Sequence, residues 1–232
     1  MIMKYLCAVV LALFATATSA VTVTAHSWVV ADQAGAILQE SNSHELRSIA
    51  SITKLMTAMV VLDAQQDLDK KIGPHTRRQL LQLALIKSDN NAANTLCQNY
   101  PGGRDDCLVA MNAKAKALNM RHTKFVDPTG LGVMNISTGR DLVAMVLAAK
   151  DYKEIVDSSK SAVLRIGKTM IHNTNRLVNQ TYTISKTGYI RAAGGCIVMM
   201  LDTVVGQRIV ILLGSKNTHT RVPEAEFISR LF

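Results

Sequence analysis

The chain has 232 residues, a formal net charge of +9 and a hydrophobic content of 48%. This length suits one domain with a sizeable core behind a short N-terminal segment. The excess of Lys and Arg forms no basic run and no basic helix stripe, so we expect no nucleic acid partner. The six His residues show no metal-ligand spacing, and we expect neither a metal nor another cofactor.

The N-terminal segment has the pattern of a secretory signal peptide. Lys4 precedes an apolar core at residues 6–14, and small residues follow at 15–20. The core is too short for a stable membrane span, so we expect export without a stable membrane anchor. The expected boundaries are a signal peptide at 1–20, cleaved within about 17–25, and a mature domain at 21–232.

The remaining chain predicts strands, then a helical region, then strands again. The strands are expected at 27–31, 36–39, 181–190, 196–202 and 208–214, the helical region from 51 to about 158, and a last helix at 223–231. The last three strands follow one another through short turns and form a meander. The last helix is expected to pack on the sheet through Ala225, Phe227, Ile228 and Leu231. The pattern predicts an α+β domain with one antiparallel sheet of about five strands, a helical subdomain and a C-terminal helix on the sheet.

Ser51 and Lys54 stand at the start of a predicted helix. Lys54 is the only charged residue from Ile49 to Leu62. A lone charge in such an apolar segment indicates a specific role for this lysine. Side chains three residues apart project from one helix face, which places an amine beside a serine hydroxyl. The ordinary alternative is that Ser51 only caps the helix and Lys54 is a surface lysine. The apolar positions of this helix are Ile52, Leu55, Met56, Met59 and Val60.

The triplet Ser88-Asp89-Asn90 lies between two helical segments. An apolar helix at 79–86 precedes it and a helical run at 92–96 follows it. A tight connection of this kind can point short polar side chains into a cleft. The alternative is that the three side chains only cap and turn the chain.

Lys186-Thr187-Gly188 ends a β-rich run and continues into Tyr189. On a strand that lines a cleft, Gly188 would let a substrate backbone lie close alongside. Lys186 and the Thr187 hydroxyl would then point into the site, unless Lys186 is only an exposed edge lysine. The three motifs in this order, each on the element that its chemistry requires, predict a serine acyl-transfer enzyme with a lysine base.

The motifs resemble those of the low-molecular-mass penicillin-binding proteins, which are serine D-alanyl-D-alanine peptidases. The likeness is closest to the penicillin-binding protein 7 type, the D-alanyl-D-alanine endopeptidases. It covers nearly the whole chain after the N-terminal segment, with further similar segments at 50–60, 111–115, 125–131 and 185–190.

Two features depart from the family pattern. The family has an extra stretch between the first two motifs, whereas here Ser88 follows Ser51 by only 37 positions, bridged by residues 70–74. We also expect no second domain or membrane-surface helix after the last predicted strand. The first departure would reshape one wall of the cleft.

The resemblance implies a β-lactamase/transpeptidase-like fold with the active site between the sheet and the helical subdomain. It implies peptidoglycan stem peptides as substrate, β-lactam antibiotics as covalent inhibitors and a periplasmic location, and we expect a monomer. An acidic polymer such as the cell wall would also attract a basic protein.

The implied catalytic groups are Ser51 as nucleophile, Lys54 as base, Ser88 as proton relay and Asn90 as the orienting amide. The substrate-binding groups are Lys186 and Thr187 for a carboxylate, with Gly188 beside them, and the N–H groups of Ser51 and Tyr189 for the oxyanion. Lys54 is expected to be neutral because of burial and the nearby charge of Lys186.

Two other functions remain open from the residues alone. A class A β-lactamase has the same three motifs but needs a glutamate that activates the deacylating water, in a Glu-x-x-Leu-Asn setting. Here the Leu118-Asn119 pair has Ala115 at the glutamate position, and no glutamate occurs between Asp106 and Asp151. A catalytically silent peptidoglycan-binding protein is the second alternative. The motifs also leave open whether a peptidase trims terminal D-alanine or cuts cross-links.

We expect structural roles for the three cysteines that follow the N-terminal segment and for Asp127. Cys97 and Cys107 flank a turn at 100–103 and could form a disulfide in an oxidising compartment, whereas Cys196 lies in an apolar strand and is expected to be an inert core thiol. Asp127 precedes a proline in a loop, and we expect it to support that loop rather than to catalyse.

Overall fold

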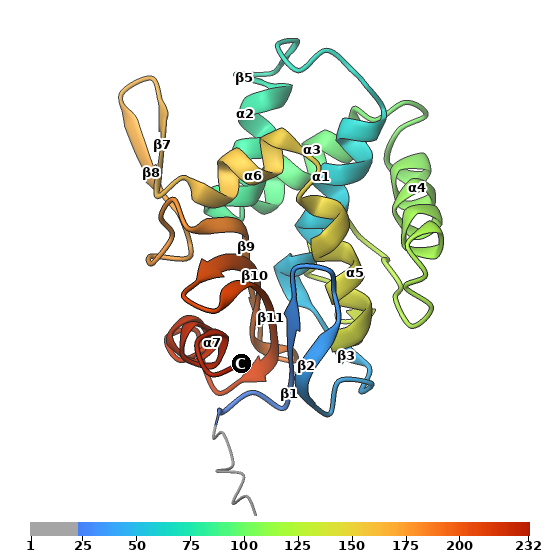
Figure 1. Ribbon diagram of the computed structural model, residues 1–232. Helices are drawn as coiled ribbons and strands as arrows, with labels where there is room; N and C mark the ends of the chain where they lie inside the picture. Colours follow the sequence, from blue (N-terminus) through green and yellow to red (C-terminus); the bar gives the residue numbers. More distant parts are fainter. Residues whose placement is uncertain (1–22) are drawn as a thin grey trace, which may run out of the picture.

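The computed structural model describes residues 23–232, so the predicted signal peptide lies outside the described residues. Its centre is an antiparallel sheet of five strands in the order β2-β1-β11-β10-β9 (Figure 1). The predicted α+β fold and its five-stranded sheet are confirmed. The strands are β1 (Ser27–Asp32), β2 (Ile37–Ser41), β9 (Tyr182–Ile190), β10 (Gly194–Thr203) and β11 (Gly206–Ser215).

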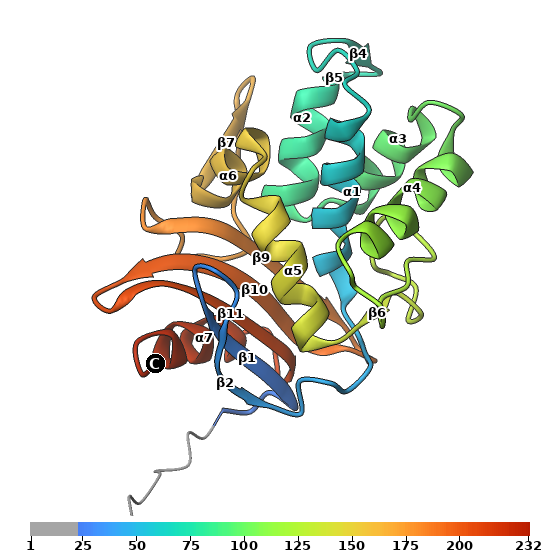
Figure 2. The ribbon, with the colours of Figure 1, turned by 45° about the vertical axis from the view of Figure 1, so that its right-hand side comes forward.

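Both faces of the sheet are covered, which explains why its central strands are almost continuously apolar. Helix α7 (Arg221–Ser229) packs on one face, over side chains such as Val30 and Leu212. The helical subdomain covers the other face, where Val29 and Ile211 join the larger core (Figure 2). Because successive strand side chains point to opposite faces, neighbouring residues of one strand enter different cores.

The helical subdomain surrounds α1, whose residues 53–61 are all buried. This helix follows η1 (Ala50–Ile52), a single 3₁₀ turn. Helix α1 spans Thr53–Asp63. The other elements of the subdomain are α2 (Arg77–Gln82), the π-helical segment η2 (Leu83–Lys87), α3 (Asn90–Gln98), α4 (Arg104–Ala117), α5 (Gly139–Ala149) and α6 (Lys153–Lys160). Within residues 23–232, none of the helices has the length and apolar character needed to cross a membrane.

Short paired strands join the helices and were not predicted. The pairs are β3 (Arg47–Ser48) with β6 (Ile136–Ser137), β4 (Lys71–Ile72) with β5 (His75–Thr76), and β7 (Val163–Ile166) with β8 (Thr169–His172). The β7–β8 hairpin has a signal in the sequence, because Gly167 and Lys168 form a two-residue connection between two β-rich runs. In the structure Gly167 has φ +58°, as a tight hairpin turn requires. The bridge of residues 70–74 that the sequence places after the first motif contains β4 and the turn that leads into β5.

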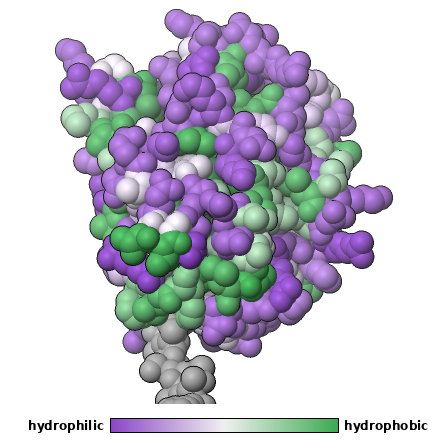
Figure 3. Space-filling view, in the orientation of Figure 1, coloured by the Kyte–Doolittle hydropathy of each residue, from purple (hydrophilic) through white to green (hydrophobic). Residues whose placement is uncertain are grey.

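The C-terminal helix packs on the sheet through fewer residues than predicted. Ala225 and Ile228 are buried there, but Phe227 and Leu231 are 54% and 46% exposed. The helix therefore presents a narrower apolar stripe to the sheet than the sequence suggested. Apolar surface is visible over α7 and the adjacent β10–β11 turn in the space-filling view (Figure 3), where Val204 is also exposed.

Cys97 and Cys107 are joined by a disulfide between the end of α3 and the first turn of α4, with their Cα atoms 5.4 Å apart. The bond closes a short loop, so its loss should lower the unfolding free energy by about 2–3 kcal/mol in the chain-entropy view. Urea denaturation of Cys97→Ala/Cys107→Ala measures this loss. Reductant should destabilise the wild type but not the double variant. Two free thiols at these positions, found by alkylation and mass spectrometry of exported protein, would contradict the pairing.

Candidate active site

Ser51 lies in the 3₁₀ turn immediately before α1, rather than in the first turn of the α-helix itself. Ala50 precedes it with φ +46°, a left-handed conformation that costs free energy in a residue other than glycine. Ser51 is partly buried in this strained turn, while its neighbours Ala50 and Ile52 are fully buried. The serine thus lies at a sharp bend at the edge of the core.

Lys54 is fully buried, and its Nζ has three partners. Nζ lies 2.7 Å from Ser51 Oγ, 2.8 Å from Asn90 Oδ1 and 2.6 Å from the Thr129 carbonyl oxygen. The three contacts use all the hydrogen-bonding capacity of the amine. The structure therefore places the first motif and Asn90 together, as predicted.

Burial lowers the pKa of Lys54 to about 8, while the charges of Asp127 and Asp89 act to raise it. The sequence analysis attributed part of this lowering to the charge of Lys186, but Lys186 is not among the causes of the Lys54 pKa shift. The repulsion acts instead on the pKa of Lys186, which is held well below its usual range by complete burial and by the charges of Lys54 and Arg221. An amine with a pKa near 8 can hold or accept a proton close to neutral pH.

The Ser88-Asp89-Asn90 triplet divides its side chains between two roles. Ser88 has a left-handed backbone, φ +61°, and its Oγ accepts a hydrogen bond of 2.8 Å from Lys186 Nζ. Asn90 reaches Lys54. Asp89 turns the other way and caps α3 by accepting a 3.0 Å hydrogen bond from the N–H of Ala92. The capping interpretation therefore applies to Asp89, and Ser88 and Asn90 contact the two lysines.

Strand β9 brings the third motif to the same place from the edge of the sheet. Lys186 Nζ also donates to the Thr187 carbonyl at 2.9 Å, and the Thr187 hydroxyl donates to Thr174 Oγ1 at 2.7 Å. Tyr189, two residues further along the strand, is 50% exposed. The motif therefore joins Ser88 and Thr174 through buried polar groups.

Gly188 is required by the chain itself. A Cβ at this position would lie 3.0 Å from both the Ile49 carbonyl oxygen and the Ser51 backbone nitrogen. The sequence attributed the glycine to a close approach of substrate backbone. The close approach in the structure is that of β9 to the turn that carries Ser51, which keeps the Ser51 N–H next to the strand.

The loop after Phe125 supplies the third partner of Lys54. Asp127 accepts hydrogen bonds from the N–H groups of Thr129, Gly130 and Gly132, at 2.7, 2.8 and 2.7 Å. It also accepts from the Thr129 hydroxyl and from Asn135 Nδ2. These bonds support the predicted structural role of Asp127, and they fix the carbonyl group of Thr129 against Lys54. The role of Thr129 was not predicted, because a backbone carbonyl leaves no sequence signal.

Gly130 has to be a glycine for the same reason of close packing. Its φ is +83°, and a Cβ would lie 1.9 Å from the Ala50 carbonyl oxygen. The loop can therefore lie directly against the turn that carries Ser51.

Arg221, on α7, is a further site residue that the sequence did not indicate. Its Nη1 donates to the Gly188 carbonyl at 2.5 Å from beneath the sheet, and burial lowers its pKa. Within residues 23–232, no carboxylate forms an ion pair with Lys54, Lys186 or Arg221. Basic groups gathered in a buried place without paired acids favour the binding of an anion, because its negative charge raises their pKa values and stabilises their protonated forms. In the described residues, no group of three or more His, Cys, Asp or Glu could hold a metal ion.

Comparisons with known proteins agree with this geometry. The chain matches the profile of the peptidase S11 family, D-alanyl-D-alanine carboxypeptidase, over residues 14–73 and 70–217. The two matched segments meet at residues 70–73, in the region where the sequence lacks the stretch that the resemblance implies.

The curated relatives include a D-alanyl-D-alanine endopeptidase of Pseudomonas aeruginosa, 37% identical over 234 residues, with 88% of this chain and 76% of the relative covered. A D-alanyl-D-alanine endopeptidase of Escherichia coli is 38% identical over 206 residues, covering 76% of this chain and 66% of the relative.

Among solved structures, penicillin-binding protein D2 of Listeria monocytogenes in its cefotaxime-bound form has a TM-score of 0.79 at 26% identity, covering 89% of this chain and 96% of that chain. A mutant form of the Streptomyces K15 DD-transpeptidase has a TM-score of 0.82 at 25% identity and the same coverage. The family profile, the relatives and the shared fold agree, and the chain belongs to the peptidase S11 family of D-alanyl-D-alanine carboxypeptidases.

Proposed function

We propose that this protein is a serine D,D-peptidase that cleaves D-alanyl bonds of peptidoglycan through an acyl-enzyme on Ser51. The observation that carries the proposal is the contact between the buried amine of Lys54 and the Ser51 hydroxyl, at 2.7 Å. An amine beside a serine, with its other partners fixed, is the arrangement that nucleophilic catalysis requires. The family and the relatives support the same reaction class.

The partners of Lys54 suit an amine that acts as a base. Neutral Lys54 has two N–H groups and one lone pair. The Asn90 Oδ1 and Thr129 carbonyl oxygens accept the two N–H groups, which leaves the lone pair facing the Ser51 hydroxyl. Lys54 takes the Ser51 proton while Ser51 Oγ attacks the D-alanyl carbonyl carbon, and the carbonyl oxygen becomes an oxyanion. The N–H groups of Ser51 and Tyr189 stabilise this oxyanion.

The second half of acylation moves the proton to the leaving group. Ser88 gives its hydroxyl proton to the leaving amine as the C–N bond breaks, and protonated Lys54 returns to its neutral form when the proton it took from Ser51 replaces the one that Ser88 gave up. Lys186 Nζ, which donates a 2.8 Å hydrogen bond to Ser88 Oγ, holds the hydroxyl in place for this relay. Lys186 and Thr187 hold a substrate carboxylate, whose negative charge restores the positive charge of Lys186. Water then hydrolyses the acyl-enzyme and regenerates Ser51.

The preferred bond is the one that cross-links two stem peptides. This preference is supported by the relatives named as endopeptidases, which are more similar in sequence than those named as carboxypeptidases, such as the 32% identical protein of Mycobacterium tuberculosis. We further propose, on the basis of the signal-like N-terminal sequence, that the mature domain acts in the periplasm without a membrane anchor, and that it acts as a monomer.

The direct test is digestion of purified muropeptides by the mature domain, with products separated by chromatography and mass spectrometry. Cross-linked dimers should be converted to monomers faster than monomeric pentapeptides lose D-alanine. Release of D-alanine alone would assign a carboxypeptidase. Muropeptide binding without turnover of either substrate would assign a silent binding protein.

The rate of Ser51 acylation should rise with pH through an inflection near 8, because only neutral Lys54 can take the serine proton. Asp89→Asn should move the inflection to lower pH. It removes a charge that raises the pKa of Lys54, and asparagine caps the helix equally well. Acylation rates with a fluorescent penicillin, measured on both sides of this pH, test the prediction. The same inflection in both proteins would contradict it.

Penicillin should acylate Ser51 and remain attached for minutes or longer, whereas muropeptides turn over. A β-lactamase needs a free carboxylate to activate water. Asp127 is the acidic side chain nearest in sequence to the Thr129 carbonyl, and its two oxygens already accept five hydrogen bonds. Mass spectrometry of the acyl-enzyme over time measures its lifetime. Rapid, repeated hydrolysis of penicillin would assign a β-lactamase instead.

A further inference from the structure

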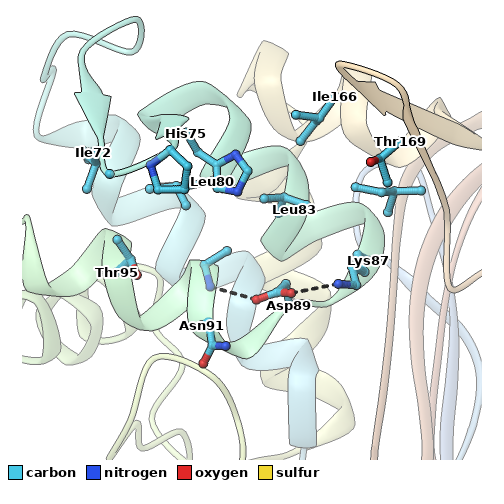
Figure 4. Close-up of a pocket in the computed structure, with 14 residues that line it drawn as sticks. Ile72, His75, Leu80, Leu83, Lys87, Asp89, Asn91, Thr95, Ile166 and Thr169 are labelled. Atoms are coloured by element: carbon cyan, nitrogen blue, oxygen red, sulfur yellow. Dashed lines mark hydrogen bonds and ion pairs between the residues drawn. The ribbon is translucent and has the colours of Figure 1, made fainter.

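A pocket of about 540 Å³ is lined by Lys87, Asp89 and Asn91, which alternate in sequence with Ser88 and Asn90 (Figure 4). Its sides are the β4–β5 hairpin, η2, α3 and the β7–β8 hairpin. The catalytic residues Ser51, Lys54 and Lys186 do not line it. Its volume lies within the range of small-ligand sites.

The pocket and the catalytic site share one wall. Lys87, Asp89 and Asn91 line the pocket, whereas the intervening Ser88 and Asn90 contact Lys186 and Lys54. A ligand that holds the pocket-facing side chains would therefore hold the backbone that positions the two catalytic contacts. This is a physical path between two distinct sites, through a single short segment of chain.

The pocket has groups for a short peptide that carries both charges. Leu80, Leu83 and Ile171 provide apolar surface. Lys87 Nζ and Asp89 Oδ2 form an ion pair of 3.2 Å at the wall, and their side chains are 55% and 23% exposed, so a carboxylate and an amine of a ligand can both reach them.

His75 of β5 lies on another side of the pocket, formed by the β4–β5 hairpin, near Leu80 (Figure 4). Its Nδ1 is buried and has no hydrogen-bond partner among the described residues. A buried polar atom without a partner is costly, so a rotation of this side chain that turns Nδ1 toward a bound ligand would be favourable.

We propose that this pocket is a second binding site for a peptide branch of peptidoglycan that is not being cut, and that its occupancy accelerates acylation of Ser51. Stem peptides are short and carry carboxylates together with an amine, which matches the Lys87–Asp89 pair. The inference rests on the proposed function for its choice of ligand. The β4–β5 hairpin that forms one side lies where the two matched family segments meet, so this pocket is shaped by the feature that departs from the family pattern.

The binding test uses a stem tripeptide that ends before the first D-alanine and therefore has no bond to cleave. Thr169 and Ile171 of β8 face the pocket, and Met170 between them does not line it. Thr169→Trp should fill the pocket and abolish tripeptide binding measured by calorimetry, and Met170→Trp should leave it unchanged. Equal binding by both variants, no binding by the wild type, or equal binding of tri-L-alanine would overturn the proposal.

The coupling test measures acylation by fluorescent penicillin with and without the tripeptide. Saturating tripeptide should raise the wild-type rate about fivefold, a typical coupling between two sites. Met170→Trp should respond in the same way, and Thr169→Trp should not respond. An unchanged or lower rate in the wild type would overturn the acceleration. Failure of the wild type to take up penicillin at all would instead count against the proposed function, while tripeptide binding would still decide the pocket.

Discussion

Replacing Lys54 with Ala should slow the acylation of Ser51 by penicillin about 10²–10⁴-fold, the usual effect of removing a general base. Lys54→Arg should be as slow, because a guanidinium keeps the positive charge but does not release its proton. The comparison separates a base from a positive charge that only stabilises the site. Ser51→Ala should not be labelled at all.

The measurement is the rate of covalent labelling by a fluorescent penicillin, followed by mass spectrometry of the labelled peptide. Lys150→Ala, at an exposed lysine just after α5, is the matched control and should acylate at the wild-type rate. Labelling of Ser51→Ala, or near-normal acylation of Lys54→Arg, would remove these residues from the assigned roles. Thermal unfolding of each variant shows whether a loss reflects chemistry or folding.

Replacing Asp127 with Ala should lower the unfolding free energy by about 3 kcal/mol or more and also slow acylation. The change leaves the N–H groups of Thr129, Gly130 and Gly132 without their acceptor, and each buried, unpaired donor costs about 1–3 kcal/mol. At a pH well above 8, where Lys54 is neutral with or without the Asp127 charge, acylation slows because the same loop holds the Thr129 carbonyl against Lys54 Nζ.

Urea denaturation and the penicillin-labelling rate test the two effects in one protein. Asp151→Ala, at an exposed aspartate, should change neither quantity by a comparable amount. An Asp127→Ala protein of wild-type stability would show that the loop holds its shape without the carboxylate. Normal acylation in a destabilised protein would show that Lys54 does not depend on Thr129.

The helical subdomain shows how far local pattern extends. The apolar repeat from Ile52 to Val60 predicts the helix that follows Ser51, because periodicity is a property of neighbouring residues. It does not show that this helix is buried on all sides, since that depends on α3, α4 and α5 around it. The same limit applies to α7, where Phe227 is apolar and spaced like its neighbours but remains half exposed.

The Ser88-Asp89-Asn90 triplet shows the limit within a single motif. The sequence supports both a capping role and a catalytic role for its short polar side chains. The left-handed backbone at Ser88 decides between them, residue by residue, because it turns Asp89 outward to cap α3 and leaves Ser88 and Asn90 against the lysines. That backbone is set by η2 and by the packing of the helices on both sides.

The sequence by itself pointed to the proposed chemistry of this protein through a serine with a lysine three residues later, a polar triplet, and a lysine on a strand, in an order typical of one family. These signals are local, so residue type and spacing are enough to carry them. The tertiary structure alone decided how the groups are tuned and fixed. The lowered pKa of Lys54 comes from burial, its third partner Thr129 lies 75 residues away, and Gly188 and Gly130 are needed because two chain segments meet at the Ser51 turn. Burial and contact between distant segments arise only when the chain is packed, and that is why the sequence could name the candidate catalytic groups without showing what holds them in place.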